Sequence, residues 1–549
     1  MVPPHRYYYL QNFRRALDVV RRCYCDLLDA REQAFFVNFD RLPHSAQALF
    51  VRMAMRRGPW FRASRLVYEE IPDILAAAEA LVALGWLQDQ ADMTLDELFD
   101  VCTMPELRAI FGAPAVAARR KGEWLEALRG LDVAPRPYAE WCPGAEPAWR
   151  FSLGDHCDRL RLMFFGNLHQ DWSEFVLADL GVFRYEAVAF DGDARAFRAR
   201  GNIDVYLTLH GCRQALEAGT PVPDLLSVVH ACVSDNAWLE QRRAKVLFRL
   251  GQACERAQDW HTALRVYEQC AYPGARHRRI RVFERLERHQ DALALAQEAQ
   301  TQPESAAELQ AVTRMMPRLQ RHAGEPRPQR LQRPPIARQD LVLSKPSDPL
   351  SVEIVARDHL HTEDAPVYYV ENTLINALFG LLFWKAIFAP LPGAFFHPFQ
   401  RGPADLTAPD FATWRAALLE ECFAQLDSDA YRDTVWRHYE EKWGLLSPFV
   451  AWGALSDELI RLALDCIPAD HLRRFFTRIL QDLQNNRTGL PDLIRFYPAE
   501  RRYELIEIKG PGDKLQDNQS RWLQYCAEHG IAAHVCYVRW HEGETCSIQ

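Results

Sequence analysis

Two short apolar segments near the C-terminus, joined by a polar turn, constrain the fold more than any other part of the chain. Asp492 opens the run 493–497, and the segment 503–508 has the composition of a second strand. Because side chains alternate along a strand, Glu507 and Lys509 share one face, and Asp492 at the mouth of the first strand reaches that face. The sequence therefore predicts a β-hairpin that gathers two carboxylates and one ammonium group at the edge of a small sheet.

The residue types in this set are those that metal-assisted phosphodiester hydrolysis requires. Carboxylate oxygens are the ligands that Mg²⁺ and Mn²⁺ prefer. A lysine beside the metal orients an attacking water and offsets the negative charge that develops on a phosphate. The spacing of Pro491-Asp492, Glu507 and Lys509 resembles the PD-(D/E)xK nuclease signature. An ordinary exposed hairpin with a Glu-x-Lys sequence is the alternative interpretation, because this spacing alone is only moderately specific.

Residues around the hairpin favour the nuclease interpretation. Gly489 allows a sharp turn into the first strand, and Gly510 ends the second strand abruptly. The segment 514–529 is expected to form a helix, since its apolar residues recur on one side, and 531–540 has the composition of a further strand. Strand, strand, helix, strand is the core arrangement that such nucleases share.

Composition restricts the function less than the motif does. The 549 residues allow several domains, and the net charge of −8 gives no overall attraction to nucleic acid, so DNA contacts must come from local basic patches. The fourteen cysteines lack zinc-binding spacing and are expected to be reduced thiols of a cytoplasmic protein, which associates with the nucleoid when it is on DNA. The apolar run 374–388 contains Asn376 and Lys385 and falls short of a membrane span, which predicts a buried helix.

Residues 1–90 are expected to be mainly helical, and 35–39 is the one segment whose pattern also suits a strand. A helix, a break near 56–60 and a second helix, with arginines clustered around the break, indicate a winged-helix or helix-turn-helix DNA-binding region. A helical hairpin with a solvated basic face is nearly as good an interpretation. The arginines expected to contact DNA here are Arg56, Arg57 and Arg62.

The region 91–150 combines short helices with a connector rich in proline and tryptophan. Thr94 and Glu97 have the spacing of a capping box, so a helix is expected to begin between them. The basic run 119–121, followed by the apolar residues of 124–128, is similar to the second half of a SAP motif, a small helical module that binds DNA backbones. We interpret 91–150 as a SAP-like DNA-binding segment and connector.

Residues 151–320 are expected to form a domain of paired helices. Gly251, Ala263 and Tyr267 have the spacing of a tetratricopeptide repeat, in which such residues mark where two helices pack. Two degenerate repeats are too few for a free-standing solenoid. The segment is therefore interpreted as a TPR-like domain that serves as a spacer or as a face for protein partners.

The most basic run of the chain, 276–281, follows a turn at Gly274 and is expected at the start of a helix. Guanidinium groups beside the free N–H groups of a helix N-terminus make an anion site. This placement favours a pocket for a DNA phosphate slightly over a solvated charged face. The prolines and arginines of 321–350 indicate an extended linker before the last domain.

The last domain is expected to span 351–549. Glu371 is expected at the first turn of the apolar helix and is interpreted either as a partner of the helix dipole or as a metal ligand from the helix that backs the nuclease sheet. The predicted fold class is mostly α and multidomain, with a C-terminal α/β nuclease domain that contains a restriction-endonuclease-like mixed sheet.

Together these motifs resemble the bacterial type of the Fanconi-associated nuclease family, whose C-terminal domain is a VRR-NUC (virus-type replication-repair nuclease) module. The order of SAP-like, helical-repeat and nuclease segments extends the resemblance over nearly the whole chain. The motifs that carry it between about residues 365 and 540 are Glu371 nine residues before Gly380-Leu381-Leu382-Phe383-Trp384, Phe399-Gln400 before Pro403-Ala404-Asp405-Leu406, Gly489-Leu490-Pro491-Asp492-Leu493, Glu507-Ile508-Lys509-Gly510-Pro511, and Gln519 with Trp522-Leu523.

The resemblance implies a structure-selective DNA nuclease of phosphodiesterase I type that cleaves 5′ flaps and branched DNA, as an endonuclease and a 5′–3′ exonuclease, in interstrand-crosslink repair. It implies that Asp492 bridges two Mg²⁺ or Mn²⁺ ions, that Glu507 and the backbone carbonyl of Ile508 hold the catalytic ion, and that Glu371 holds the second. Lys509 would position the water. The further residues expected to bind DNA or its 5′ phosphate are Arg276, Arg278, Arg279, Lys514, Gln519 and Arg487.

Two other functions stay open at this point. One is a Holliday-junction resolvase-like or restriction-like endonuclease that uses the same site, and the other is a non-catalytic scaffold that binds DNA junctions. The presence of all four candidate active-site side chains favours an enzyme over a scaffold. Branched DNA is the expected partner, with protein partners through the helical repeat domain, and neither a membrane nor a nucleotide cofactor is expected.

Overall fold

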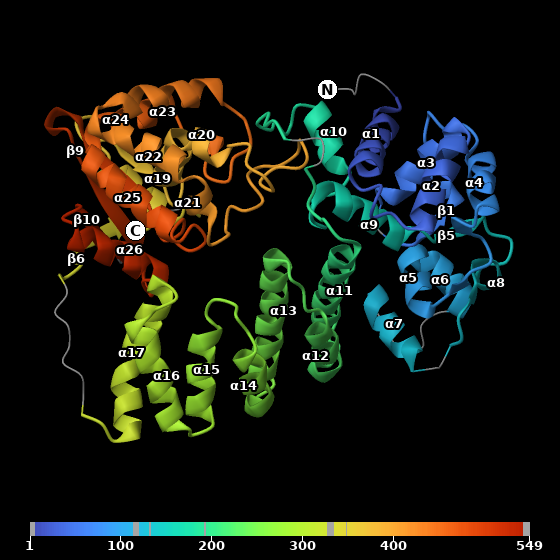
Figure 1. The fold of residues 1–549 in the computed structure, drawn as a ribbon, viewed down its shortest axis with the longest axis horizontal. Helices are drawn as coiled ribbons and strands as arrows, with labels where there is room; N and C mark the ends of the chain where they lie inside the picture. Colours follow the sequence, from blue (N-terminus) through green and yellow to red (C-terminus); the bar gives the residue numbers. More distant parts are fainter. Residues whose placement is uncertain are drawn as a thin grey trace, which may run out of the picture. The chain divides into compact units, whose positions relative to one another are not determined.

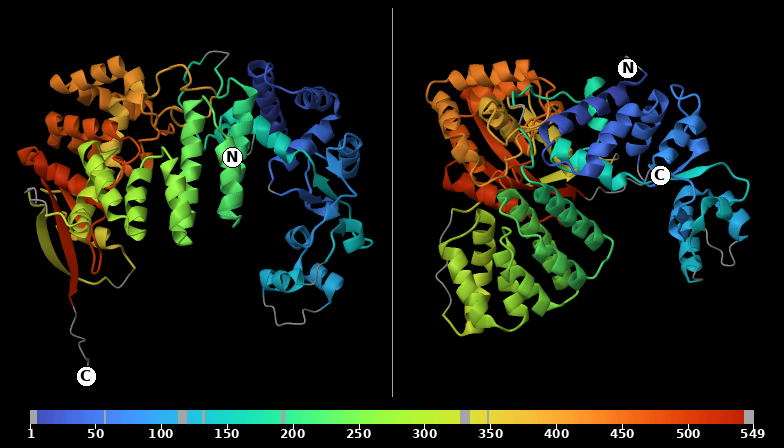
Figure 2. Two further views of the ribbon diagram at one scale, coloured as in Figure 1. Left: turned by 60° about the horizontal axis from the view of Figure 1, so that its bottom comes forward. Right: turned by 45° about the vertical axis from the view of Figure 1, so that its right-hand side comes forward.

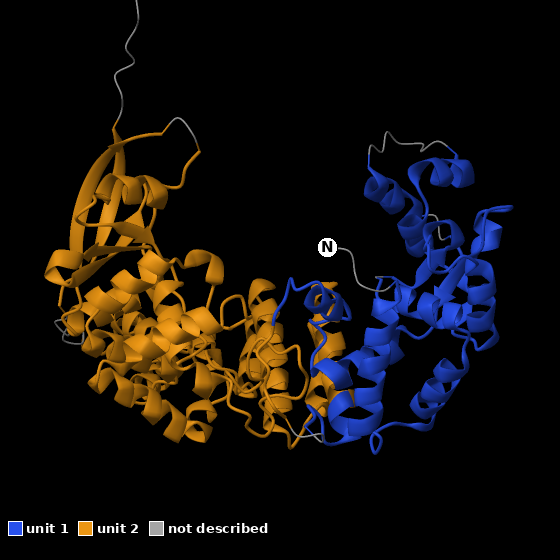
Figure 3. Ribbon diagram, turned by 90° about the horizontal axis from the view of Figure 1, so that it is seen from above, with its two compact units in different colours: residues 1–184, 191–203 blue, residues 185–190, 204–549 orange. Residues whose placement is uncertain are grey.

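The structure, a computed structural model, describes residues 6–56, 58–112, 120–130, 133–190, 194–326, 334–346 and 349–541. The chain forms two compact units, which Figure 3 colours separately: Met1–Arg184 with Asp191–Ile203, and Tyr185–Phe190 with Asp204–Gln549. Helices predominate in both units (Figure 1).

The first unit begins with helices around a small antiparallel sheet. The strand order is β1–β5–β2, and both outer strands run antiparallel to β5. Ring contacts among Phe13, Phe39 and Phe50 build the core between the helices. The elements are α1 (Tyr8–Cys23), α2 (Ala30–Arg41), α3 (His44–Ala54), β1 (Trp60–Arg62), α4 (Ile74–Ala83), β2 (Leu87–Gln88) and β5 (Ala148–Phe151).

Residues 35–39 lie inside α2, so the strand interpretation of this segment is wrong. The Asp29 carboxylate accepts the backbone N–H of Glu32 at 2.8 Å, and the Glu32 carboxylate accepts that of Asp29 at 2.9 Å. This capping box starts the helix before the aromatic run begins. Phe35 and Phe39, four residues apart, are both buried on the inner side of the helix.

A second layer of short helices follows in the same unit. The predicted capping box is confirmed, because Glu97 accepts the N–H of Thr94 at 2.8 Å and Thr94 Oγ1 accepts the N–H of Glu97 at 3.3 Å. Trp124 and Trp141 are buried in the core of this layer. The elements are β3 (Asp92–Met93), α5 (Leu95–Val101), α6 (Met104–Phe111), α7 (Lys121–Arg129), β4 (Arg136–Pro137) and α8 (Tyr138–Trp141), followed by α9 (Gly154–Phe165) and α10 (Ser173–Asp179).

From Asp204 onward, in the second unit, successive helices stack side by side, in green to yellow-green in both views of Figure 2; α11, the first of them, starts at Arg200, within the first unit. The expected pairing around Gly251 and Tyr267 is confirmed, because a Cβ added at Gly251 would lie 2.5 Å from Cε1 of Tyr267. Only glycine permits this close approach of the paired helices. The stack comprises α11 (Arg200–Glu217), α12 (Val222–Ala231), α13 (Ala237–Arg256), α14 (Trp260–Glu268), α15 (Ala275–Arg285), α16 (His289–Thr301) and α17 (Ala306–Ala323).

A mixed five-stranded sheet forms the C-terminal part of the second unit, in the order β6–β10–β9–β8–β7. β8 and β9 pair antiparallel with Leu493 opposite Ile506, and β10 runs parallel to both β9 and β6. The predicted hairpin and the predicted fold class are therefore confirmed. The strands are β6 (Ala337–Ser344), β7 (Val367–Tyr369), β8 (Leu493–Tyr497), β9 (Arg502–Lys509) and β10 (Ala533–His541), and the short helix η4 (Pro498–Glu500) makes the hairpin turn.

The interpretation of 321–350 as an extended linker is wrong for two parts of it. Helix α17 continues to Ala323, and residues 337–344 form β6, an outer strand of the five-stranded sheet. All eight residues of β6 pair with β10, which lies about two hundred positions later in the sequence. Residues 327–333 and 347–348 lie outside the described part of the chain.

Helices cover both faces of the sheet. Leu505 and Phe496 pack with α19 and the helices behind it, whereas Ile506 and Ile508 pack against α18 on the opposite face, as the strand alternation predicts. The predicted buried helix is present as α19 and α20, interrupted at Phe383. The helices are α18 (Val352–Leu360), α19 (Leu374–Leu382), α20 (Trp384–Ile387), α21 (Phe411–Trp414), α22 (Ala416–Ala424), α23 (Ala430–Glu441), α24 (Asp457–Cys466), α25 (Ala469–Gln481) and α26 (Asp517–Glu528). In the described part of the chain, no helix combines the length and the apolar character that a membrane crossing needs.

Candidate active site

The turn that leads into β8 fixes the position of Asp492. Gly489 has φ +86 and lies against Asn518 at the start of α26. A Cβ at position 489 would lie 2.7 Å from the backbone carbon of Asn518, so only glycine fits there. The N–H of Leu490 donates to Oδ1 of Asn372 at 3.1 Å. The turn is thus held from two sides, and it delivers the next residues to the edge of the sheet.

Asp492 links β9 to the residue that follows β7. Its carboxylate Oδ2 accepts the N–H of Ile508 at 2.8 Å, and its backbone carbonyl accepts the N–H of Val370 at 2.8 Å. The side chain is 5% exposed. The carboxylate therefore lies beside β9, on the sheet edge where the sequence predicted it.

Glu507 and Lys509 lie on the same face of β9 and contact one another. Lys509 Nζ donates to Glu507 Oε1 at 2.6 Å. Glu507 is fully buried and Lys509 is 8% exposed. The second carboxylate oxygen, Glu507 Oε2, has no hydrogen-bond partner among the described residues. A buried oxygen of this kind is costly unless another group completes its coordination.

Burial and mutual repulsion disfavour the ionised forms of both carboxyl groups. Burial raises the pKa of Glu507 to about 8, with a further contribution from the negative charge of Asp492, while Lys509 opposes the shift. Burial likewise raises the pKa of Asp492 to about 6, against the stabilising Ile508 N–H and Lys509. The site contains more negative charge than its single lysine neutralises, and a divalent cation would supply what is missing.

Glu371 belongs to the turn before α19, not to the first turn of the helix, which begins at Leu374. Tyr369 Oη donates to Glu371 Oε2 at 2.5 Å, and Asn372 Nδ2 donates to Glu371 Oε1 at 3.2 Å. The charge of Glu371 contributes to the raised pKa of both Asp492 and Glu507. The three carboxylates are therefore electrostatically coupled.

Within the described residues, no three His, Cys, Asp or Glu side chains are already arranged closely enough to hold a metal ion. Lys509 contacts Oε1 of Glu507 and Tyr369 contacts Oε2 of Glu371, which leaves Oε2 of Glu507 without a hydrogen-bond partner among the described residues. The hard oxygen donors and the unpartnered Glu507 Oε2 nevertheless fit Mg²⁺ or Mn²⁺.

Tyr369 and Asn372 are site residues that the sequence analysis missed. Tyr369 precedes Glu371 by two positions at the end of a strand, so alternation could have shown that the two share a side. Asn372 adopts φ +52, and no sequence pattern announces that backbone conformation in a non-glycine residue.

The residues near α26 that were expected to contact DNA differ in burial and in their hydrogen bonds within the protein. Gln519 is buried, and its Oε1 accepts the N–H of Gln516 at 2.9 Å, so it closes the start of the helix; this use does not favour a DNA contact. Lys514 is exposed in the loop that precedes α26. Arg487 lies in the segment before Gly489 and lines a cavity of the second unit.

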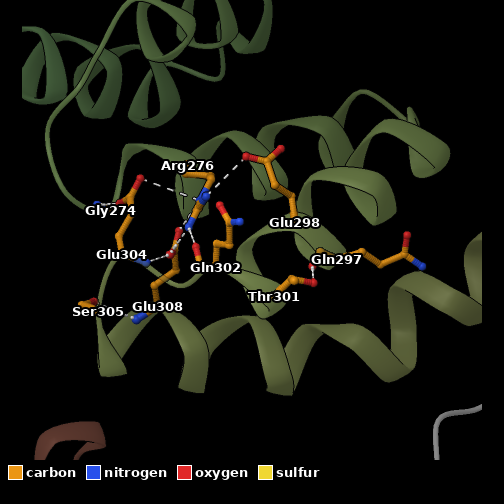
Figure 4. A network of polar contacts seen from close by, with 9 residues as sticks. All are labelled: Gly274, Arg276, Gln297, Glu298, Thr301, Gln302, Glu304, Ser305 and Glu308. Carbon is orange, nitrogen blue, oxygen red and sulfur yellow. Dashed lines mark hydrogen bonds and ion pairs between the residues drawn. The ribbon is translucent and has the colours of Figure 1, made fainter.

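Arg276 does not present a free guanidinium group to a phosphate, contrary to the sequence interpretation. The turn at Gly274 and the helix start at Ala275 are as predicted. The guanidinium group, however, donates to both oxygens of Glu308 at 2.6 and 2.8 Å and to the carbonyl of Gln302 at 2.7 Å (Figure 4). Glu298 and Glu304 lie within 3.4 and 3.7 Å of it.

These contacts make Arg276 a clamp between α15 and the two helices that follow. Hydrogen bonding to Glu308 is the main reason that the pKa of Arg276 is raised. Arg278 pairs with Glu255 at 3.3 Å, and Arg279 is half-buried with an Nε that has no hydrogen-bond partner in the described part of the chain. The basic run is therefore turned largely toward its own carboxylates, because neighbouring helices of the stack supply acidic groups opposite it.

The arginines expected to bind DNA in the first unit differ in how exposed they are. Arg62 is 9% exposed and donates to Glu146 at 2.6 Å and to Glu106 at 2.9 Å, so it holds β1, α6 and residue 146 together and is not available to DNA. Arg56 is exposed and donates to the carbonyl of Arg65 at 3.1 Å. Arg57 lies outside the described residues.

Comparison with protein families matches three segments of the chain. Residues 7–88 match the domain described as FAN1, HTH domain. Residues 92–141 match the Fanconi anemia-associated nuclease SAP domain. Residues 427–540, which contain Asp492, Glu507 and Lys509, match the VRR-NUC domain.

Relatives named as Fanconi-associated nuclease 1 or as its homolog match nearly the whole chain. A Pseudomonas aeruginosa protein named Fanconi-associated nuclease 1 homolog is 51% identical over 540 residues, which cover 98% of this chain and 97% of that protein. The homolog of Oryza sativa subsp. japonica is 25% identical over 98% of this chain and 63% of its own length. Fanconi-associated nuclease 1 of Homo sapiens is 22% identical over 97% of this chain and 62% of its own length.

Two solved structures share the fold over their full length. The structure of paFAN1 bound to a 2-nt 5′-flap DNA with a gap has a TM-score of 0.96 and 50% identity, and the match covers 99% of this chain and 100% of that one. The structure of paFAN1 bound to a 1-nt 5′-flap DNA with a gap has a TM-score of 0.93 and 50% identity, covering 98% and 100%.

Proposed function

The chain belongs to the Fanconi-associated nuclease family, and we propose that it cleaves 5′ flaps and related branched DNA in interstrand-crosslink repair. As a member of this family it is a structure-selective, metal-dependent DNA nuclease. The single observation that carries the proposal is the buried set of Asp492, Glu507 and Lys509, in which one carboxylate oxygen lacks a partner. The relative bound to 5′-flap DNA, at 50% identity, supports the choice of substrate.

We propose that Asp492, Glu507 and the backbone carbonyl of Ile508 hold the catalytic ion, and that Glu371 holds a second ion shared with Asp492. Mg²⁺ or Mn²⁺ bound there would polarise the scissile phosphate and lower the pKa of a coordinated water. Tyr369 and Asn372 orient Glu371 through their hydrogen bonds to its two oxygens. Oriented carboxylates of this kind reduce the reorganisation that metal binding requires.

Lys509 has two roles in this proposal. Its ammonium group neutralises part of the charge of Glu507, which it contacts at 2.6 Å. Once the carboxylate binds a cation, the same group is free to hold the attacking water and to stabilise charge on the phosphate oxygens. The reaction is phosphodiester hydrolysis of the phosphodiesterase I type, both as a 5′–3′ exonuclease and as an endonuclease.

We infer a division of labour among the other segments. The helical N-terminal region (residues 1–90) and the SAP-like segment (91–150) would contact the DNA backbone, with Arg56 as an exposed candidate. The helical repeat domain (151–320) would provide further contacts to DNA or a surface that binds protein partners. A repair nuclease acts on the chromosome, so the proposed location is the nucleoid.

The decisive experiment is cleavage of end-labelled 5′-flap duplexes by the full-length chain with Mg²⁺ or Mn²⁺. The proposal requires incision near the flap junction and its loss in Asp492→Ala. Symmetric nicking of a four-way junction without preference for flaps would instead identify a resolvase. Tight junction binding with no cleavage by the unmodified chain would identify a scaffold.

A further inference from the structure

The buried helix α19, which lies behind the sheet, contains one polar side chain. Every residue of α19 is buried, and Asn376 is the only one of them that has a polar side chain. Burying an amide costs free energy unless its hydrogen bonds are made inside the protein. An apolar side chain would avoid this cost, which points to a role in the contacts that Asn376 makes.

Asn376 joins two segments that are far apart in the sequence. Its Nδ2 donates to the carbonyl of Asn372 at 2.8 Å and to the carbonyl of Arg487 at 2.8 Å. Asn372 follows Glu371 directly, whereas Arg487 lies in the segment that leads to β8. Both N–H groups of the amide are therefore used, and they connect the segment that carries Glu371 to the segment that carries Asp492.

A second asparagine makes the same connection closer to the carboxylates. Asn372 Oδ1 accepts the N–H of Leu490 at 3.1 Å, and Asn372 Nδ2 donates to Glu371 Oε1 at 3.2 Å. Asn372 has φ +52, a left-handed conformation that is uncommon outside glycine and that surrounding contacts must stabilise. The hydrogen bond from Asn376 to the backbone carbonyl of Asn372 is one of these contacts.

Together the two asparagines continue the pairing of β7 with β8 beyond the ends of the strands. The strands are antiparallel, and the last pair of their register is Tyr369 and Leu493. One position further, the N–H of Val370 donates to the carbonyl of Asp492 at 2.8 Å. Beyond this point the chain turns into α19, and the side-chain amides of the two asparagines replace backbone groups as the links to the segment 487–490.

We propose that Asn376 is a positioning residue for metal-dependent cleavage, which fixes Glu371 relative to Asp492 although it donates no hydrogen bond to either carboxylate. Two carboxylates share divalent ions only when their separation suits the ions, so a link that exists before the ions bind reduces the reorganisation that binding requires. A neutral amide provides this link without adding charge beside the site. The inference rests on the proposed function, which assigns both carboxylates to divalent ions.

Two substitutions separate the local contact of Asn376 from its long-range contact. Asn376→Leu keeps the approximate volume and removes both hydrogen bonds. Asn376→Ser keeps a hydroxyl that can donate to the carbonyl four residues earlier, that of Asn372, but its shorter side chain leaves the carbonyl of Arg487 without a donor. Both variants should bind Mn²⁺ about tenfold or more weakly than the unmodified chain, the usual effect of removing a group that supports a metal ligand.

The measurement is calorimetric titration of the full-length chain with Mn²⁺ in the absence of DNA, and Asp492→Ala identifies the heat that comes from the site. Binding of 5′-flap DNA in EDTA should be unchanged in both variants. In cleavage assays, the Mn²⁺ concentration that gives the half-maximal rate should rise by the same factor as the dissociation constant, while KM for the flap stays constant. A residue that only stabilises the fold would lower the melting temperature without changing this metal dependence.

Gln47→Met is the matched control. Gln47 is a buried amide of the first unit that likewise donates to two backbone carbonyls, those of Phe39 at 2.8 Å and Leu42 at 3.1 Å. Its loss should lower the melting temperature and leave the affinity for Mn²⁺ unchanged. Asn376→Ser, the milder change, decides the matter if Asn376→Leu does not fold. A folded Asn376→Ser variant that binds Mn²⁺ as tightly as the unmodified chain would overturn the inference, as would equal losses of Mn²⁺ and DNA affinity.

Flap cleavage distinguishes the two proposals. A chain that cleaves flaps, and whose folded Asn376 variants keep the affinity for Mn²⁺, contradicts only the role of Asn376. A chain that binds Mn²⁺ through Asp492 but cleaves no DNA contradicts the proposed function, and a weaker affinity of the Asn376 variants for Mn²⁺ would still support the positioning role.

Discussion

Lys509 Nζ lies 2.6 Å from Glu507 Oε1, while Oε2 of the same fully buried carboxylate has no hydrogen-bond partner among the described residues. One ammonium group therefore contacts one oxygen of a buried carboxylate whose pKa is raised mainly by burial and further by the negative charge of Asp492. Such an arrangement is stable only when protons or metal ions complete it. The predictions about this site follow from the unpartnered oxygen and the uncompensated negative charge.

Replacing Lys509 by Met, which keeps the length of the side chain and removes its charge, should lower the single-turnover rate of flap cleavage by about 10²–10³-fold. The reason is that both the water-positioning group and a charge opposite Glu507 are lost. Lys385→Ala, which removes an exposed lysine paired with Glu421, is the control and should cleave normally. Full activity of the Lys509 variant would contradict the assigned role.

Without divalent ions, the stability of the second unit should fall as the pH rises from about 5 to about 9. Burial raises the pKa of Glu507 to about 8 and that of Asp492 to about 6, so the folded state binds more protons than the unfolded state in this window. Stability then decreases with pH. Glu507→Gln should flatten the dependence of the melting temperature on pH in EDTA, whereas the exposed Glu441→Gln should not. A wild-type curve that rises across this range would refute the assignment.

Binding of Mg²⁺ should release protons, because the metal requires ionised carboxylates. At pH 7 the raised pKa of Glu507 leaves much of this group protonated in the metal-free protein. Calorimetric titrations in buffers of different ionisation enthalpy should therefore report proton release at pH 7 and less of it at pH 9. The apparent affinity should increase with pH between these limits. Identical heats in all buffers at pH 7 would contradict the prediction.

Arg276→Ala should destabilise the helical stack by about 3–5 kcal/mol, since it leaves the buried Glu308 carboxylate without its cation. The measurement is urea unfolding of the full-length chain, and Arg288→Ala, which breaks an exposed pair with Asp291, is the control. Because Arg276 is occupied by its own carboxylates, a folded Arg276→Lys variant should keep any preference for 5′-phosphorylated ends. Loss of that preference with unchanged stability would instead support the DNA-phosphate pocket that the sequence predicted at this run.

Lys514→Ala should weaken binding to flap DNA without changing which DNA shapes are preferred. Lys514 is exposed in the loop between β9 and α26, and a contact from it to a backbone phosphate carries no sequence information. Losing one such contact should reduce the slope of log affinity against log salt concentration by about 0.9. A slope equal to that of the unmodified chain would exclude the contact.

Local patterns in the sequence determined the catalytic hairpin and the helix behind it. Alternation alone placed Glu507 and Lys509 on one face and Ile506 on the other, because side-chain direction in a strand depends only on position. The capping box at Thr94 and the buried helix that begins at Leu374 were readable for the same reason. Each of these features is decided within a few residues.

Tertiary structure alone decided which charges are paired and which remain available. Nothing near Arg276 in the sequence shows that Glu308 lies opposite it, and Arg62 meets Glu146 from 84 residues away. Residues 337–344 become a strand only because β10, much later in the chain, offers its edge. The alternation that orients a side chain is local, whereas the partner that neutralises its charge is brought there by the whole fold, and this decides whether an arginine stabilises the protein or binds its substrate.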